Sequence, residues 1–150
     1  MSPSRINKIV DEDLPSHGVY INVGRHSGEF RGSEIRAGEF RLKPDSIESL
    51  RERGFTNEEI HAIVGPRRTL ARRKEQSERL SLVESDRVLR LERISDMADR
   101  VFGNHEKAQR WLRKESRALE KARPIDLLRS ETGAHIVEQE LHRIDYGMFA

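Results

Sequence analysis

The sequence predicts an all-α protein: a helix-turn-helix unit followed by a small helical domain, behind an irregular or short-hairpin N-terminal segment. Two observations lead to this fold class. From residue 45 onward, apolar residues recur at steps of three and four, which is the spacing of one helix face. Capping patterns open these stretches and glycines end them. We expect an extended or partly disordered segment over residues 1–43, the helix-turn-helix region over 44–93 and the helical domain over 94–150.

The composition is that of a soluble chain with a thin core. Of its 150 residues, 36% are charged and 35% are hydrophobic, and none is cysteine. No apolar run approaches the roughly 18 residues of a membrane span, and the first residues lack the apolar stretch of a secretory signal. Without cysteine there is no disulfide framework and no thiolate ligand for zinc. These features predict a cytoplasmic protein without a membrane segment, whose small core is completed by a partner.

The N-terminal segment carries one weak strand pattern. Apolar and polar residues alternate from Gly18 to Gly24. Further glycines follow at Gly28, Gly32 and Gly38, but they do not form a Gly-x-Gly-x-x-Gly motif, so nucleotide binding is not predicted. A short hairpin and a mobile arm both fit this pattern.

Two short helices are predicted between residues 45 and 64. Asp45-Ser46-Ile47-Glu48 and Thr56-Asn57-Glu58-Glu59 both have the capping-box pattern, in which two side chains satisfy free backbone N–H groups. Gly54 and Gly65 supply the helix ends. Pro66 suits the first turn of the next helix, because the N–H that proline lacks is not needed there.

The next helix carries the basic excess of the chain. Residues 66–79 hold six basic and two acidic side chains, whereas the whole chain has a net charge of only +2. Leu70 and Ala71 are expected to face inward. A helix, a short turn containing glycine and a basic helix form the layout of a helix-turn-helix DNA reader. A solvated basic helix face is the alternative. The candidate DNA-contacting residues are Arg67, Arg68, Thr69, Arg72, Arg73 and Lys74.

The rest of the chain is predicted to form helices separated by short loops. Ser81-Leu82-Val83-Glu84 is a third capping box and opens a long helix, which ends at Gly103. A further helix carries Trp111, which we expect in the core. A short apolar turn begins at Pro124, and a last helix follows over residues 132–147.

Candidate catalytic and metal-binding groups do not assemble into a site. His135, Glu138 and His142 share one helix face, yet the sequence supplies no obvious further zinc ligand, and a solvated face with a local Glu–His contact is favoured. No Gly-x-Ser-x-Gly elbow is present. We therefore expect no bound metal, no cofactor and no enzymatic activity.

The C-terminal tail is unusually apolar for a chain end. In Tyr146-Gly147-Met148-Phe149-Ala150, an aromatic residue stands in the last turn of the final helix, and a methionine and a second aromatic residue follow it. A frayed end is the usual fate of such a segment. Exposed apolar residues of this kind instead favour docking, either on the chain's own domain or into a partner's groove.

Taken together, these motifs resemble the Xre/MbcA/ParS antitoxin family from about residue 44 to the end. The DNA-binding half of the family is matched by Arg67-Arg68-Thr69-Leu70-Ala71-Arg72-Arg73, Leu80-Ser81 and Glu84-Ser85-Asp86-Arg87-Val88-Leu89-Arg90-Leu91. The toxin-binding half is matched by Val101-Phe102-Gly103, Glu106-Lys107-Ala108, Trp111-Leu112, Ala118-Leu119, Pro124, Leu127-Leu128, Thr132-Gly133-Ala134 and Tyr146-Gly147.

The resemblance implies the antitoxin of a bacterial type II toxin–antitoxin pair. In this family the partner is usually a RES-domain toxin that consumes NAD, so NAD would be the toxin's substrate. The C-terminal domain would cover the toxin's active site, and the helix-turn-helix would repress the operon's own promoter, usually as a homodimer. The implied toxin-binding residues are Arg143, Tyr146, Gly147, Met148, Phe149 and Ala150.

The sequence differs from the family pattern at one position, and one alternative function is also considered. Relatives often carry glycine after the Ala-Leu pair, but Glu120-Lys121-Ala122-Arg123 contains none, so the turn must differ or the preceding helix must extend. The alternative function is a stand-alone helix-turn-helix transcription regulator whose C-terminal domain only dimerises.

Overall fold

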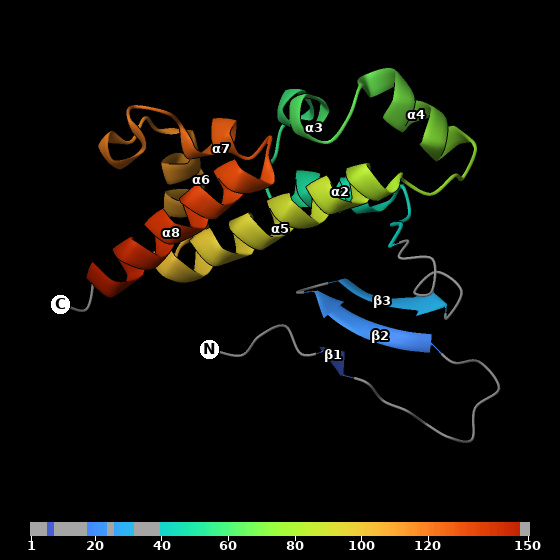
Figure 1. The fold of residues 1–150 in the computed structure, drawn as a ribbon. Coiled ribbons are helices and arrows are strands. Elements are labelled where there is room, and N and C mark those ends of the chain that lie inside the picture. The colour runs from blue at the N-terminus through green and yellow to red at the C-terminus, as the bar shows by residue number, and fades with distance from the viewer. Residues whose placement is uncertain (1–5, 8–17, 24–25, 32–39, 148–150) are drawn as a thin grey trace.

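The computed structural model describes residues 6–7, 18–23, 26–31 and 40–147, with side chains over 40–147. Residues 40–147 form an all-helical body, which confirms the predicted fold class (Figure 1). Its elements in chain order are α2 (Ser46–Glu52), α3 (Asn57–Ile63), α4 (Arg67–Glu75), α5 (Leu82–Phe102), α6 (His105–Arg113), the 3-10 turn η1 (Arg117–Leu119), α7 (Pro124–Leu127) and α8 (Glu131–Gly147).

Local sequence signals set most helix ends. The side chains of Thr56 and Ser81 each accept a hydrogen bond from the backbone N–H of the glutamate three residues on. That glutamate's carboxylate in turn accepts a hydrogen bond from the backbone N–H of Thr56 or Ser81, so both capping boxes are confirmed. Gly54 (φ +99°) follows the end of α2, and Gly103 (φ +62°) ends α5 in the left-handed conformation. Asn104 then caps α6.

The capping box predicted at Asp45 is wrong. Asp45 has helical dihedrals (φ −61°, ψ −19°) and makes no side-chain cap. A cap needs an extended backbone at that position. Here the preceding residues already turn, because the Ser46 amide and hydroxyl both bond the Lys43 carbonyl.

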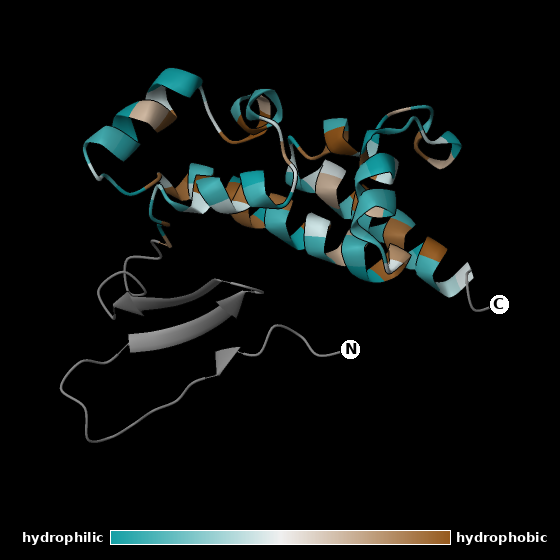
Figure 2. Cartoon of the chain, turned by 180° about the vertical axis from the view of Figure 1, so that it is seen from behind, coloured by the Kyte–Doolittle hydropathy of each residue, from teal (hydrophilic) through white to brown (hydrophobic). Residues whose placement is uncertain are grey.

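The long helix α5 lies at the centre of the body. It packs against α2, α6 and α8, and its inward residues Leu91 and Ile94 are fully buried. Figure 2 shows the apolar residues gathered where these helices face one another, whereas α4 is almost entirely polar. Trp111 lies half-buried at the edge of this core, with its ring centroid 5.6 Å from that of Phe102. Among the described residues, no helix is long and apolar enough to cross a membrane.

The described part of the N-terminal segment forms a small antiparallel sheet. Its strands are β1 (Ile6–Asn7), β2 (Gly18–Val23) and β3 (His26–Arg31), in the spatial order β1-β2-β3. β2 coincides with the alternating stretch of the sequence and pairs with β3 in register, Val19 opposite Phe30 and Ile21 opposite Gly28. The backbone therefore has the hairpin of the two alternatives.

Candidate DNA-binding and partner-binding surfaces

The turn between α3 and α4 has the tight geometry of a helix-turn-helix. Only Val64, Gly65 and Pro66 separate the two helices. Gly65 is buried, and the Val64 carbonyl accepts a hydrogen bond of 3.2 Å from Arg87 Nη1 on α5. Pro66 stands one position before the first helical turn rather than inside it. The turn is thus fixed to the central helix, and it determines the direction in which α4 leaves.

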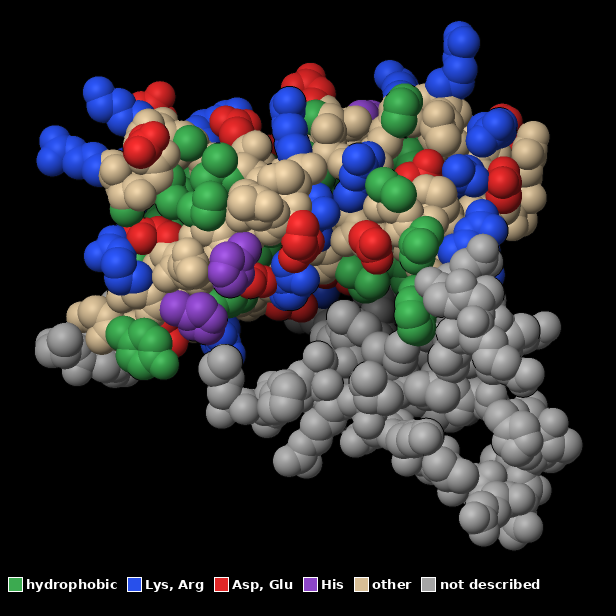
Figure 3. Space-filling model, viewed as in Figure 1, with side chains coloured by type: hydrophobic (Ala, Val, Ile, Leu, Met, Phe, Trp, Pro, Cys, Tyr) green, Lys and Arg blue, Asp and Glu red, His purple; other side chains and the backbone are tan. Residues whose placement is uncertain are grey.

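The exposed side of α4 is strongly basic. Figure 3 shows Lys and Arg side chains projecting along the edge of the molecule that carries α4. Thr69 is half-buried and Leu70 is buried, whereas Ala71 is exposed and does not face inward as expected. Among the described residues, no ion pair neutralises the four exposed cations. These are Arg67, Arg68, Arg72 and Lys74.

Arg73 does not lie with the other candidate DNA contacts. Its side chain is only 12% exposed and is turned toward the start of α5. Its guanidinium is 2.7 Å from Glu84 Oε2 and 3.0 Å from Glu78 Oε1. The structure therefore brings Arg67, Arg68, Arg72 and Lys74 together on a solvent-facing surface and uses Arg73 inside the protein.

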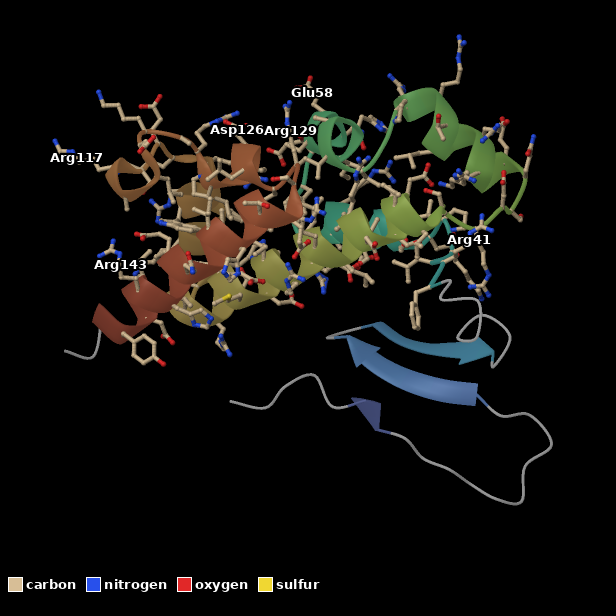
Figure 4. The ribbon with its side chains drawn as sticks, viewed as in Figure 1. Arg41, Glu58, Arg117, Asp126, Arg129 and Arg143 are labelled. Atoms are coloured by element: carbon tan, nitrogen blue, oxygen red, sulfur yellow. The ribbon has the colours of Figure 1, made fainter. Side chains whose placement is uncertain are left out.

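The candidate partner-binding residues lie at the other end of the molecule, on the last turns of α8 (Figures 1 and 4). The side chains of Arg143 and Tyr146 are exposed, Tyr146 by 76%. Arg143 donates two hydrogen bonds to Glu140, of 2.6 and 2.8 Å, and this carboxylate raises the pKa of Arg143 above its ordinary value. Ile136 adds an exposed apolar side chain to α8. Gly147 is the last helical residue, and residues 148–150 of the predicted tail lie outside the described residues.

Two of the three residues considered as metal ligands on α8, His135 and Glu138, contact other side chains. Arg93 Nε lies 2.6 Å from Glu138 Oε1, so the carboxylate is already paired. His135 Nδ1 lies 4.0 Å from the other oxygen of Glu138. Over residues 40–147, no group of histidine and carboxylate side chains has the arrangement of a metal site.

Long-range ion pairs hold the two halves of the body together, and sequence reasoning missed them. Arg113 on α6 donates to both oxygens of Glu59 on α3 at 2.8 Å each, and to the Gly54 carbonyl at 3.0 Å. Arg90 on α5 donates to the Leu128 carbonyl and to Glu131. Hydrogen bonds from Arg93 and Arg90 lower the pKa of Glu131. The partners lie about 40 to 54 positions apart in the sequence, so no local pattern of the sequence indicates these pairs.

Comparison with known proteins assigns each half of this body to a described domain. Residues 40–93 match the model of the antitoxin Xre-like helix-turn-helix domain, and residues 97–147 match that of the antitoxin Xre/MbcA/ParS C-terminal toxin-binding domain. An antitoxin Xre of Pseudomonas putida is 37% identical over 98 residues, covering 65% of this chain and 62% of the relative. An antitoxin Xre of Yersinia enterocolitica is 35% identical over 86 residues, covering 57% and 58%. The chain thus spans about three fifths of the length of each relative.

Proposed function

Because the chain belongs to the Xre/MbcA/ParS antitoxin family, we propose that it is an antitoxin that binds a toxin through its C-terminal domain and DNA through α4. Both matched domains are binding modules rather than enzymes. The functional regions would be 44–93 for DNA and 94–150 for the toxin. The observation that carries the proposal is the separation of two exposed surfaces: the unpaired cations of α4 at one end and the α8 terminus with Tyr146 at the other.

The proposed DNA target is the promoter of the protein's own operon, bound in the cytoplasm. The N-terminal residues of α4 would enter the major groove, while Arg68 and Arg72 hold phosphates. A homodimer would present two copies of α4 to a two-fold symmetric operator. The result would be repression of the operon.

The proposed toxin is a RES-domain protein that consumes NAD. The last turns of α8 and the tail would lie over its active site, with Arg143 and Tyr146 as contacts. An exposed aromatic side chain next to an arginine is typical of the residues that dominate protein–protein binding energy. The antitoxin itself would need no cofactor.

Two variants separate these functions. Changing Arg68 and Arg72 to Ala should weaken promoter binding and reduce the slope of log K against log salt by about two, since each lost phosphate contact lowers it by about 0.9. Neutralisation of the toxin should persist. Arg110→Ala, which removes an exposed cation from α6, is the matched control and should bind DNA normally. A double variant with unchanged promoter affinity would place the DNA surface elsewhere.

Deleting residues 146–150 should have the reverse effect. Co-expression with the neighbouring gene's product should become toxic, while operator binding stays intact. If growth is rescued as well as by the full chain, the tail takes no part in neutralisation. If in addition no toxin co-purifies with the full chain, the alternative of a stand-alone regulator with a dimerising C-terminal domain would be supported.

A further inference from the structure

The DNA-reading helix α4 is attached to the body at few points. Leu70 is its only buried residue, and it lies in the first half of the helix. Figure 1 shows α4 standing away from the helices packed around α5. With only one buried apolar residue, packing restrains the orientation of α4 weakly, and a second attachment further along the helix would restrain it more.

Arg73 provides that second attachment, one turn beyond Leu70. Its Nε lies 2.7 Å from Glu84 Oε2, and its Nη1 donates to Glu78 Oε1 at 3.0 Å and to the Arg79 carbonyl at 3.3 Å. The side chains of Arg73 and Glu84 are 12% and 10% exposed, so water screens the pair only weakly. The guanidinium is thereby directed into the connection between α4 and α5.

Glu84 is itself immobilised, which makes it a rigid attachment point. The same oxygen that meets Arg73, Oε2, accepts the Ser81 amide at 2.8 Å, and the Glu84 amide donates to Ser81 Oγ at 3.1 Å. This capping box forms the first turn of α5, the central helix of the whole body. The reading helix is therefore tied to the element that carries the rest of the protein.

We infer that the Arg73–Glu84 pair is a latch that sets the orientation of α4, so that Arg73 is a positioning residue for DNA binding and not a phosphate contact. The inference rests on the proposed function of α4. It explains why a cation inside a basic helix is turned toward carboxylates and largely shielded from solvent, instead of lying with Arg68 and Arg72 on the exposed side.

The variant Glu84→Gln tests the latch against simple electrostatics. Glutamine still completes a capping box, so α5 keeps its first turn. Removing a negative charge beside a DNA-binding helix should by itself strengthen DNA binding. The latch predicts the opposite: affinity for a promoter duplex should fall about tenfold, because a close and largely buried charge pair is lost and fewer molecules hold α4 in the competent orientation.

The salt dependence distinguishes a positioning residue from a contact. Arg73→Ala should weaken binding at least as much as Glu84→Gln, because it also removes the hydrogen bonds to Glu78 and to the Arg79 carbonyl. It should nevertheless leave the slope of log K against log salt unchanged. Arg72→Ala, the matched control on the exposed side, should lower that slope by about 0.9. The double variant R73A/E84Q should bind no worse than Arg73→Ala alone, because Arg73→Ala already removes the pair with Glu84. A slope that falls equally for Arg73→Ala and Arg72→Ala, with tighter binding by Glu84→Gln, would overturn the inference.

Hydrogen exchange tests the latch without DNA. The amides of α4 should exchange faster in Arg73→Ala and in Glu84→Gln, and no faster in the double variant than in Arg73→Ala. Amides of α8 should be unaffected. Failure of the wild-type protein to bind promoter DNA would refute the proposed function and leave this measurement to decide on the latch. Unchanged α4 exchange in both single variants would refute the latch.

Discussion

Replacing Gly133 with Ala should destabilise the protein, although alanine is normally the better helix former. Gly133 lies in the first turn of α8, where its amide donates to the Ser130 hydroxyl at 3.0 Å. A Cβ at this position would overlap the Leu127 carbonyl oxygen and lie 2.8 Å from the carbonyl carbon of that residue. The obstacle is backbone, so no side-chain rotation removes it.

Two opposed effects set the magnitude. Gly→Ala in a helix interior stabilises by about 1 kcal/mol when there is room. Overpacking that displaces backbone costs about 1–3 kcal/mol, and here the α7–α8 turn must open, which also strains the 3.2 Å bond from Arg90 Nη1 to the Leu128 carbonyl. The difference leaves a fall of about 1 kcal/mol in the free energy of unfolding, and of about 2–4 °C in Tm.

The assay is urea unfolding at 25 °C, paired with a thermal melt, on the full chain. Gly147→Ala is the matched control, because Gly147 is the other glycine of α8 and a Cβ there would meet nothing within 4 Å. Its free energy of unfolding should stay the same or rise by up to about 0.5 kcal/mol. A Gly133 variant as stable as wild type would show that the α7–α8 turn yields easily, and would refute the reasoning.

Three further outcomes follow from named contacts. Glu120→Gly should raise Tm by about 2–4 °C, because Glu120 (φ +55°) occupies the left-handed region; Glu106→Gly, in α6, should lower it instead. Arg113→Ala should cost about 2 kcal/mol in urea unfolding, because it leaves Glu59 without its bidentate partner. Arg123→Ala breaks an equally bidentate pair with Asp126, but this pair is exposed to solvent, so its loss should not change stability measurably; equally small losses in both variants would contradict a stabilising role of the Arg113–Glu59 pair. The pKa of Glu131 is lowered from its ordinary 4.5 by Arg93 and Arg90, so this pairing stabilises the fold above pH 4.5 and is lost as the carboxylate is protonated on acidification. Glu131→Gln should therefore make the decline of Tm below pH 4.5 less steep.

Local signals were sufficient for most helices. The capping boxes at Thr56 and Ser81 and the stop at Gly103 depend on neighbours within four residues, so the sequence alone predicts them. The capping box predicted at Asp45 was wrong because the backbone already turns at Lys43. The pattern of side chains in the sequence does not indicate this turn. Where relatives carry glycine after Leu119, this chain makes the turn without one. Glu120 and Lys121 adopt positive φ themselves, and α6 does not extend.

The candidate DNA surface was predictable in part. Arg68 and Arg72 lie one turn apart on the face away from Leu70, and helical periodicity places both in solvent. Arg73 follows the buried Leu70 by three residues, so helical periodicity places it near the inward side. The prediction that Arg73 contacts DNA rested on the charge of the segment alone and did not take this into account. Its partner Glu84 lies eleven positions on, across a turn, where no helix rule applies. The Arg113–Glu59 clamp spans 54 positions and required the tertiary fold.

The long helix α5 separates the proposed DNA-binding surface from the proposed toxin-binding surface. With 21 residues it is roughly 30 Å long. Helix α4 lies near the N-terminal end of α5, and α8 runs toward the other end (Figure 1). A toxin bound at the α8 terminus would therefore lie clear of a duplex held by α4. In a gel-shift experiment, adding toxin to the antitoxin–promoter complex should produce a slower band and no free DNA. Release of the DNA would contradict this expectation. It would indicate coupling between the two surfaces, for which the contacts of Arg87, Arg90 and Arg93 on α5 are the candidates.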